Sequence, residues 1–356
     1  MREKKKTKFK LLHLDEAEAW DALVTSFTPY DVYYLSGYVR GFQLHGDGEA
    51  ELIYAEWPQG RMLNVLFKRD ISQMAVFQGH LPKNTYFDAK TPYGYGGPLV
   101  DGALTLEALD AYRMFCRKQG LICEVALFHP QLRNWELVPG LYQIGQARQT
   151  VAMDTSNKEI IWQNLTSKNR NMIRKAQKNG LRTYWGRSPE LIPKFMAIYQ
   201  ETMDRDSVKD YYYFDAAYYQ SVLDDLPHHA LWFYTEQEDV IASMGIFLFA
   251  DGRMHYHLSA STMAGRRLAA TNLMLYDAAV WASQNHLVSL HLGGGRTSAA
   301  DDSLLKFKHG FQRHDSLEFC VGTAIYDQEK YDFLTQEYER LTGKQANKDF
   351  VPCYRG

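Results

Sequence analysis

The chain has 356 residues, of which 46% are hydrophobic and 23% charged, and its formal net charge is -2. This composition excludes a mainly disordered chain, and the charge excludes the global basic field that drives non-specific nucleic-acid binding. No run approaches the roughly 20 apolar residues of a membrane-spanning helix, and the four cysteines form no Cys-x-x-Cys pair. We therefore expect a cytoplasmic protein with no integral membrane segment, no disulfide framework and no metal site.

The first half of the chain predicts a helix, a strand hairpin, a glycine-rich loop, a second helix and a buried strand. The helices show apolar residues at helical spacing, and the hairpin turns at Pro58-Gln59-Gly60. The second helix stops at Gly120. In chain order, the segments are 15–27 (helix), 50–57 and 62–67 (hairpin), 91–98 (loop), 104–119 (helix) and 121–128 (strand).

The second half predicts the same order with more helix in front. Short turns join its first three strands into an antiparallel meander, and a loop, a helix and a buried strand follow. The segments are helices 160–179, 189–205 and 215–226, strands 230–234, 240–249 and 254–260, loop 261–270, helix 271–285 and strand 288–292.

Helix, antiparallel strands, loop, helix and strand is the element order of the GNAT acyltransferases, and its repetition indicates a duplicated fold. We predict an α/β protein with mixed sheets, built from two tandem GNAT-like domains at residues 1–150 and 151–356. A further strand at 143–153 crosses this boundary.

A row of cations stands in the segment Asn164 to Gly180. Helical spacing places Arg170, Arg174 and Lys178 on one face. Such a row suits a diphosphate or an RNA backbone, and the alternative is a solvated basic face.

Three segments of the chain resemble the FemAB family. Residues 164–180 resemble its Arg-x-x-Ile-Arg-Lys-Ala-x-Lys-x-Gly stretch, and residues 91–98 resemble its Tyr-Gly-Gly-Pro loop. Residues 306–311 resemble its Phe-Lys-x-x-Phe-Gly element, with Gln312 where the glycine is expected. The resemblance implies transfer of an amino acid from aminoacyl-tRNA to an amine in the peptide stem of a peptidoglycan precursor.

The resemblance also implies candidate catalytic residues. The lysine of the Phe-Lys element is linked to catalysis in the family, and Lys308 matches it, with Lys306 as the substitute in a shifted register. A cation there would stabilise the oxyanion or the leaving ribose oxygen, whereas the alternative is a surface lysine on a turn. Asp88, just before the glycine loop, is the carboxylate of the first half that we expect to touch the substrate amine.

Further residues are predicted to bind substrate through backbone N–H groups, aromatic rings or positive charge. They are Tyr93, Gly94, Tyr95, Gly96, Gly97, Arg170, Arg174, Arg266, Arg267 and Gly294. Arg266 and Arg267 stand where GNAT enzymes hold the pyrophosphate of coenzyme A, but Ala269 and Ala270 replace the glycines of that loop. This departure favours aminoacyl-tRNA over acyl-coenzyme A as the donor.

The expected partners are tRNA and a peptidoglycan precursor, either a UDP-muramyl peptide or its lipid-linked form, and no cofactor is expected to bind tightly. A lipid-linked acceptor would bring the protein to the inner face of the membrane. Two other functions remain open. One is an acyl-coenzyme A-dependent N-acyltransferase acting on an amino sugar or peptide, and the other is a non-catalytic binding protein with a duplicated GNAT fold.

Overall fold

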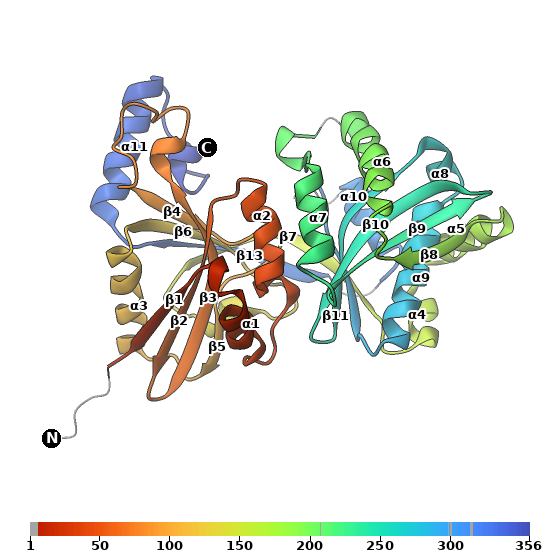
Figure 1. The fold of residues 1–356 in the computed structure, drawn as a ribbon, viewed down its shortest axis with the longest axis horizontal. Coiled ribbons are helices and arrows are strands. Elements are labelled where there is room, and N and C mark those ends of the chain that lie inside the picture. The colour runs from red at the N-terminus through yellow and green to blue at the C-terminus, as the bar shows by residue number, and fades with distance from the viewer. Residues whose placement is uncertain (1–5, 207, 298, 300, 314–315) are drawn as a thin grey trace. The chain divides into compact units, whose positions relative to one another are not determined.

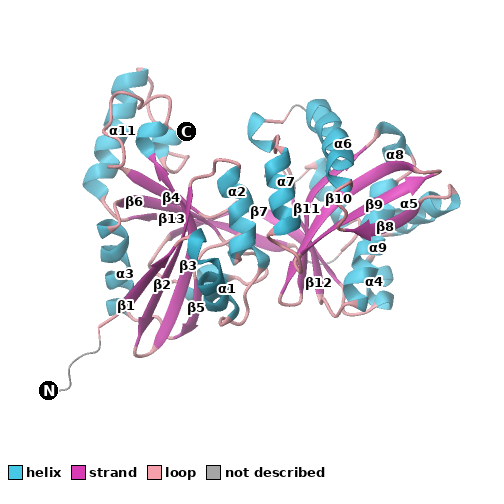
Figure 2. Cartoon of the chain, in the orientation of Figure 1, coloured by secondary structure: helices cyan, strands magenta, loops and turns pink. Residues whose placement is uncertain are grey.

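The structure is a computed structural model that describes residues 6–206, 208–297, 299, 301–313 and 316–356. The chain forms two compact units, Met1–Ala147 with Phe319–Gly356, and Arg148–Glu318 (Figure 1). Both units contain helices and strands (Figure 2), and each unit is built on a mixed sheet. The predicted α/β class is therefore confirmed.

The C-terminal residues belong to the first unit. The boundary predicted near residue 150 falls inside β7 (Gln143–Asp154), where the chain passes from one unit to the other. The prediction placed the tail in the second domain, whereas β13 (Leu317–Ile325) pairs with β6 (Leu121–Leu127) and α11 (Gln328–Thr342) packs on β6. Pairing between segments so far apart leaves no periodic signal in the sequence.

The sheet of the first unit has the strand order β1-β2-β3-β4-β6-β13, with β5 beside β3. Its pairs are antiparallel except for β4 and β6, which are parallel. The predicted hairpin is confirmed, because β2 and β3 close at the pair Trp57 and Gly60. The remaining strands are β1 (Lys8–Leu12), β2 (Glu49–Trp57), β3 (Gly60–Asp70), β4 (Phe87–Lys90) and β5 (Leu99–Gly102).

Three further helices of the first unit are α1 (Ala17–Thr25), α2 (Ser36–Leu44) and α3 (Leu106–Lys118). The Thr105 hydroxyl caps α3 by accepting a hydrogen bond from the Ala108 N–H, and Gly120, at φ +79°, follows its end. The inward face of α3 buries Tyr112 and Cys116 in the apolar core. Removal of these apolar side chains from water stabilises the packing of α3 on the sheet.

The sheet of the second unit has the order β7-β12-β11-β10-β9-β8. Only β11 and β12 are parallel among its strand pairs in the described residues. The predicted meander is confirmed as β9, β10 and β11. The strands are β8 (Arg182–Gly186), β9 (Ala230–Gln237), β10 (Val240–Ala250), β11 (Arg253–Ser261) and β12 (Ser289–Gly294).

Helices cover both faces of this second sheet (Figure 1). On one face, α9 (Ala270–Gln284) packs on the strands, and α4 (Lys158–Asn164) and α5 (Ser167–Lys178) pack on α9. On the other, α6 (Leu191–Asp206) contacts β10 and β11 and carries α7 (Ala216–Asp224). The short helices α8 (Met263–Arg267) and α10 (Ser303–His309) complete the unit.

Two predicted segments differ from the structure. The single helix predicted over 160–179 is broken at Leu165, which is extended at ψ 141°, and α5 restarts at Thr166, whose hydroxyl accepts a hydrogen bond from the Asn169 N–H. The loop predicted over 261–270 contains α8, because Thr262 caps a turn there. In both places, a threonine cap marks the helix start.

Candidate active site

The centre of the candidate site is a buried lysine in the second unit. Lys308 lies near the end of α10 and is 7% exposed, and its Nζ donates a 2.6 Å hydrogen bond to the carbonyl oxygen of Gly294. Burial lowers the pKa of Lys308 to about 8, against the attraction of Asp302, because a poorly solvated site disfavours the ammonium form. Lys306 is exposed on the same helix. Of the two lysines in the motif, Lys308 is therefore the one held inside the fold.

An aspartate fixes the backbone that receives this hydrogen bond. Asp302 Oδ1 accepts from the Leu305 N–H at 2.8 Å and caps α10, while Oδ2 accepts from the N–H groups of Arg296 and Thr297, each at 2.9 Å. These bonds hold the pKa of Asp302 at about 2. A Cβ at Gly295 would lie 2.5 Å from Asp302 Oδ1, so the glycine allows this close approach.

The two parallel strands of the second sheet, β11 and β12, separate beside this site. Their ladder runs from the pair Arg253 and Ser289 only as far as His255 and His291. From there, β11 continues along β10 and β12 continues along β7. Gly294 therefore lies on the stretch of β12 that has no β11 partner among the residues the structure describes.

A tyrosine and a histidine form a second polar pair in this unit. Tyr218 Oη lies 2.6 Å from His257 Nε2. Leu258 and Tyr256 oppose consecutive residues of β10, so His257 is the extra residue of a β-bulge. Burial lowers the pKa of His257 to about 3. The imidazole is therefore neutral at physiological pH and shares one hydrogen bond with the phenol.

The predicted cation row lies on α5. Arg170 Nη1 donates a 2.7 Å hydrogen bond to the carbonyl oxygen of Leu165, so Arg170 holds the break between α4 and α5. The guanidinium of Arg174 lies over the Trp162 ring, 5.2 Å from its centroid. At the start of α5, the Thr166 N–H donates to the Gly310 carbonyl at 3.0 Å. Two of the sequence motifs, the cation segment and the lysine element, therefore meet in the fold.

Buried polar side chains hold the glycine-rich loop of the first unit. Asn134 Nδ2 donates to the Gly96 carbonyl at 2.9 Å, and Tyr34 Oη donates to the Gly97 carbonyl at 2.9 Å. Gly97 has φ +83°, and a Cβ there would lie 2.6 Å from a buried phenylalanine ring. Gly96 and Gly97 are buried, whereas Tyr93, Gly94 and Tyr95 are partly exposed. The loop therefore has a fixed inner half and an accessible half.

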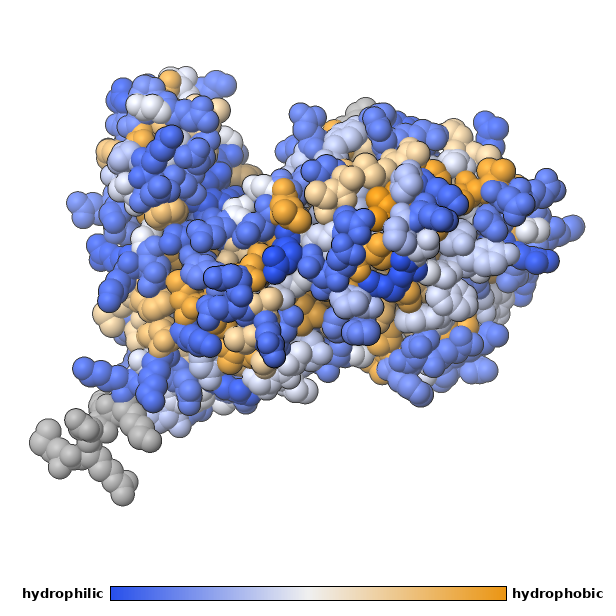
Figure 3. Space-filling view, in the orientation of Figure 1, coloured by the Kyte–Doolittle hydropathy of each residue, from blue (hydrophilic) through white to orange (hydrophobic). Residues whose placement is uncertain are grey.

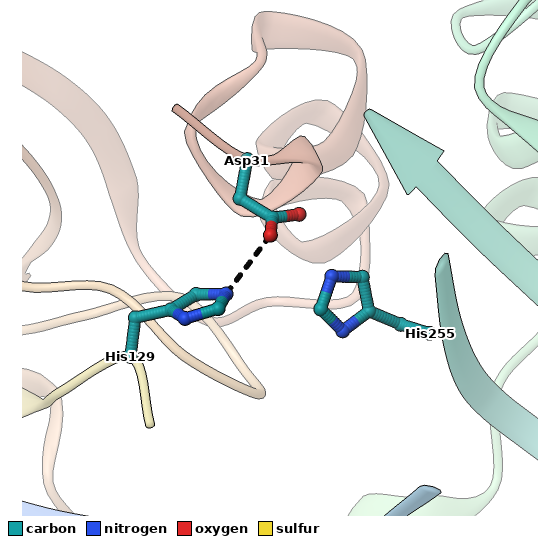
Figure 4. Close-up of side chains that lie close together, drawn as sticks. All are labelled: Asp31, His129 and His255. Atoms are coloured by element: carbon teal, nitrogen blue, oxygen red, sulfur yellow. Dashed lines mark ion pairs between the residues drawn. The ribbon is translucent and has the colours of Figure 1, made fainter. Parts of the chain in front are cut away.

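A buried aspartate and histidine support this loop (Figure 4). His129 Nε2 lies 3.0 Å from Asp31 Oδ2, and both side chains are fully buried. His129 Nδ1 accepts hydrogen bonds from the N–H groups of Gln131 and Leu132, which places the imidazole proton on Nε2. The Tyr95 ring meets the imidazole edge-on, 5.7 Å between centroids. The pair therefore positions the tyrosine.

Residues 137–235, which include the cation segment, match the FemAB family. The match agrees with the resemblance seen in the sequence and supports the prediction of an acyltransferase. The fold of the chain resembles that of FemX, at 16% identity over 91% of this chain and 99% of FemX, with a TM-score of 0.63.

Two other solved structures share the fold. One is a conserved protein of unknown function from Bacteroides thetaiotaomicron, at 10% identity over 89% of this chain and 99% of that one, with a TM-score of 0.57. The other is L-PGS from Bacillus licheniformis, at 10% identity over 93% and 98%, with a TM-score of 0.53. In a comparison with curated protein sequences, none matches significantly. Among the described residues, no helix has the length and apolarity needed to cross a bilayer.

The segment predicted to correspond to the coenzyme A loop of GNAT enzymes is helical in this chain. The Arg266 N–H donates to the Thr262 carbonyl at 3.0 Å, and the Leu268 N–H donates to the Ala264 carbonyl at 3.1 Å. These N–H groups are therefore engaged within the chain and do not form an open cradle for a pyrophosphate. Arg266 and Arg267 project from α8 as exposed side chains.

Replacing Ala269 by glycine is expected to stabilise the protein. Ala269 precedes α9 at φ 60° and ψ 36°, a left-handed conformation that costs a non-glycine residue about 1 kcal/mol. We expect Ala269→Gly to raise the free energy of unfolding by about 0.5 kcal/mol in urea titrations. Ala270→Gly also removes a buried methyl group, but from a helical position, and should lower stability. Equal losses in both variants would contradict the left-handed geometry.

The structure places Asp88 in a buried ion-pair network. Its carboxylate is fully buried, with Arg69 Nε 2.7 Å from Oδ1 and Arg355 Nε 2.5 Å from Oδ2. Tyr354 Oη donates to Oδ2 at 3.3 Å. The carboxylate thus ties the C-terminal residues to β4. This placement favours a structural role over the predicted contact with a substrate amine.

Sequence reasoning missed several polar residues that form buried or capping contacts within each unit. Asp302 carried a usable signal, since an aspartate before a helical segment is a typical N-cap. Tyr218, His257 and Asn134 carried none, because a bulge and long-range contacts position them.

Proposed function

We propose that this protein transfers an aminoacyl group from aminoacyl-tRNA to an amine in the peptide stem of a peptidoglycan precursor. The observation that carries the proposal is Lys308, a buried cation held on the Gly294 carbonyl in a unit that carries part of the FemAB match. The family match supports aminoacyl transfer. The choice of a peptidoglycan precursor as the acceptor is the more specific part of the proposal.

The reaction needs the protein mainly to position the two substrates and to supply a positive charge. The acceptor amine attacks the ester carbonyl, an oxyanion forms, and the intermediate collapses with release of the ribose oxygen. In our proposal, the Lys308 ammonium stabilises the oxyanion and gives a proton to the leaving oxygen. The amine loses its own proton to solvent, and the neutral Lys308 takes a proton back from solvent, so charge and protons balance over the cycle.

The donor assignment is supported by α8. The N–H groups of Arg266 and Leu268 are engaged within the chain, which disfavours coenzyme A, while Arg174, Arg266 and Arg267 remain exposed for phosphates. In this proposal, Tyr93, Gly94 and Tyr95 form the accessible part of an acceptor-binding loop, and Lys306 adds positive charge near Lys308.

A transfer assay with the full-length protein tests the proposal. Aminoacyl-tRNA labelled in the amino acid is incubated with UDP-muramyl-pentapeptide, with vesicles of phosphatidylglycerol, or with no acceptor, and acetyl-coenzyme A replaces the donor in a parallel series. Label on the muramyl peptide, identified by mass, is the expected result. Label on the lipid would show that the acceptor is phosphatidylglycerol and not the muramyl peptide. Transfer from acetyl-coenzyme A would show that the donor is not aminoacyl-tRNA. No transfer in any series would indicate a non-catalytic binding protein.

A further inference from the structure

Three side chains of the kinds that bind metal ions meet at one end of the sheet of the first unit. Glu49 and Glu51 are two positions apart at the start of β2, so both lie on one face of the strand. Leu12, the last residue of β1, pairs with Leu52. The next residue, His13, has an extended backbone at φ -117° and ψ 172°, so it comes level with Glu51 on the same face of the sheet. One nitrogen or oxygen atom from each of the three side chains lies within 4.8 Å of the others.

Glu51 carries a buried oxygen atom with no hydrogen-bond partner. Its side chain is only 2% exposed, and Lys68 Nζ lies 3.4 Å from Oε1, whereas Oε2 has no hydrogen-bond partner in the part of the chain that the structure describes. The Lys68 ammonium also lies over the Phe87 ring, 4.5 Å from its centroid. Burial raises the pKa of Glu51, against the attraction of Lys68, and the charge of Glu49 adds to the rise. A buried polar atom without a partner is costly, and a metal ion bound to Oε2 would remove that cost.

The distance between His13 and Glu49 suits a shared metal ion better than a hydrogen bond. His13 Nδ1 lies 3.5 Å from Glu49 Oε1, whereas a charge-assisted hydrogen bond between such groups is about 2.7–2.9 Å long. Two ligands of a tetrahedral zinc ion, each about 2.0–2.1 Å from the metal, lie about 3.3 Å apart. The side chains of His13 and Glu49 are 41% and 64% exposed, so an ion has access from solvent and both side chains have room to turn toward it.

The ligand atoms of this cluster favour a transition-metal ion over magnesium or calcium. Zinc binds both imidazole nitrogen and carboxylate oxygen, and three protein ligands leave its fourth position to water. Magnesium and calcium prefer oxygen ligands alone. The two carboxylates together with the Lys68 ammonium leave one negative charge beside a neutral imidazole, and this charge attracts a cation. Because the histidine and the glutamates come from different strands, no short motif marks the cluster, and the sequence alone predicted no metal site.

The cluster stands where an edge strand joins the sheet. β1 ends the strand order of the first unit and pairs with β2 alone among the described strands (Figure 1). Phe9 and Leu11 of β1 are only partly buried against the core, and hydrophobic side chains show at the surface of this part of the first unit in Figure 3. An ion held by His13, just after β1, and by the glutamates of β2 would cross-link the two strands at this end.

We propose that His13, Glu49 and Glu51 bind a zinc ion that fastens the end of β1 to β2. His13 Nδ1 and one oxygen atom of each glutamate are the ligands, Oε2 in the case of Glu51, and Lys68 stays on the other oxygen of Glu51. The inference goes beyond the proposed function and does not rest on it, because no residue assigned to aminoacyl transfer takes part.

A matched pair of double variants of the full-length protein tests this inference. His13→Ala/Glu49→Gln removes the two accessible ligands and leaves the buried Glu51 in place. His80→Ala/Glu56→Gln, the control, removes an exposed histidine and an exposed glutamate of the same unit. Zinc binding to protein freed of metal is measured by competition with a chromogenic zinc chelator. We expect wild type and control to bind one zinc ion with equal affinity, and His13→Ala/Glu49→Gln to bind it at least about ten-fold more weakly.

The opposite results would overturn the inference. Equal zinc binding by both double variants would place the ion on other residues, and a wild-type protein that shows no saturable zinc binding would have no such site. Displacement of zinc by an equal concentration of magnesium would contradict a site with an imidazole ligand. Circular dichroism spectra that match wild type show that the variants are folded. Aminoacyl transfer by the zinc-free protein is measured separately, so failure of the zinc site and failure of the proposed function are distinguishable.

Discussion

Lys308→Ala is expected to slow aminoacyl transfer at least about 100-fold, the loss that follows removal of one stabilising donor from an oxyanion. The reason is geometric. Lys308 Nζ is buried and held on the Gly294 carbonyl, so no other described cation shares its position. Single-turnover kinetics with saturating UDP-muramyl-pentapeptide measure the chemical step. Binding of the muramyl peptide should be retained, and Lys306→Ala, which removes the exposed lysine of the same helix, should retain most of the rate.

The pH dependence of transfer gives a sharper test of the same residue. The ordinary lysine pKa of 10.5 is lowered to about 8 in the folded protein, so the ammonium is present below pH 8 and is lost as pH rises through that value. If the ammonium is the active form, the rate should fall above pH 8. In Lys308→Arg, this descending limb should disappear, because a guanidinium stays charged. A rate that rises through pH 8 would instead make Lys308 a base.

Stability measurements separate catalysis from folding at this position. Because the folded-state pKa lies below the unfolded one, burial of the ammonium opposes folding below pH 8, and this penalty fades between about pH 8 and 10.5. Lys308→Met therefore should not lower the melting temperature at pH 7. A large loss of stability would mean that Lys308 is a structural residue, and its effect on transfer would then carry no catalytic meaning.

The elements of the fold that local patterns define were predictable. The hairpin of β2 and β3, the meander of β9 to β11 and helices α3 and α9 follow from alternation, helical spacing and the glycine or threonine at their ends. The tail was not predictable, since the pairing of β13 with β6 joins residues about 200 positions apart. The break at Leu165 was also missed, because Arg170 and Thr166 stabilise it through contacts with no periodic signal.

The candidate site was predictable only where a motif carried it. Lys308 stood in a recognisable element, and its burial agrees with that reading. Asp88 was predicted to touch substrate because it precedes the glycine-rich loop in the sequence. In the structure it is buried inside the first unit, where it forms ion pairs with Arg69 and Arg355. Arg170 and Arg174 shared a face as predicted, yet one holds a helix junction and the other is exposed. Helical spacing gives the direction of a side chain but not its partners.

Asp88→Ala is expected to destabilise the protein by about 3 to 5 kcal/mol, the usual loss when one partner of a buried ion pair is removed. The variant leaves Arg69 and Arg355 without a counter-charge, although their side chains are only 21% and 19% exposed. It also removes the acceptor that Tyr354 Oη contacts. Urea denaturation of the purified variant measures the change in unfolding free energy.

Arg355→Ala is the matched control, because it removes one cation but leaves the salt bridge between Asp88 and Arg69. Its effect should be smaller, and in the double variant Asp88→Ala/Arg355→Ala the losses should not add, since both act on one network. A further variant, Asp88→Asn, distinguishes the two roles considered for Asp88. If Asp88→Asn has wild-type stability but has lost aminoacyl transfer, the carboxylate acts on substrate. If its stability falls and the folded fraction keeps its activity per molecule, Asp88 anchors the C-terminal residues on β4.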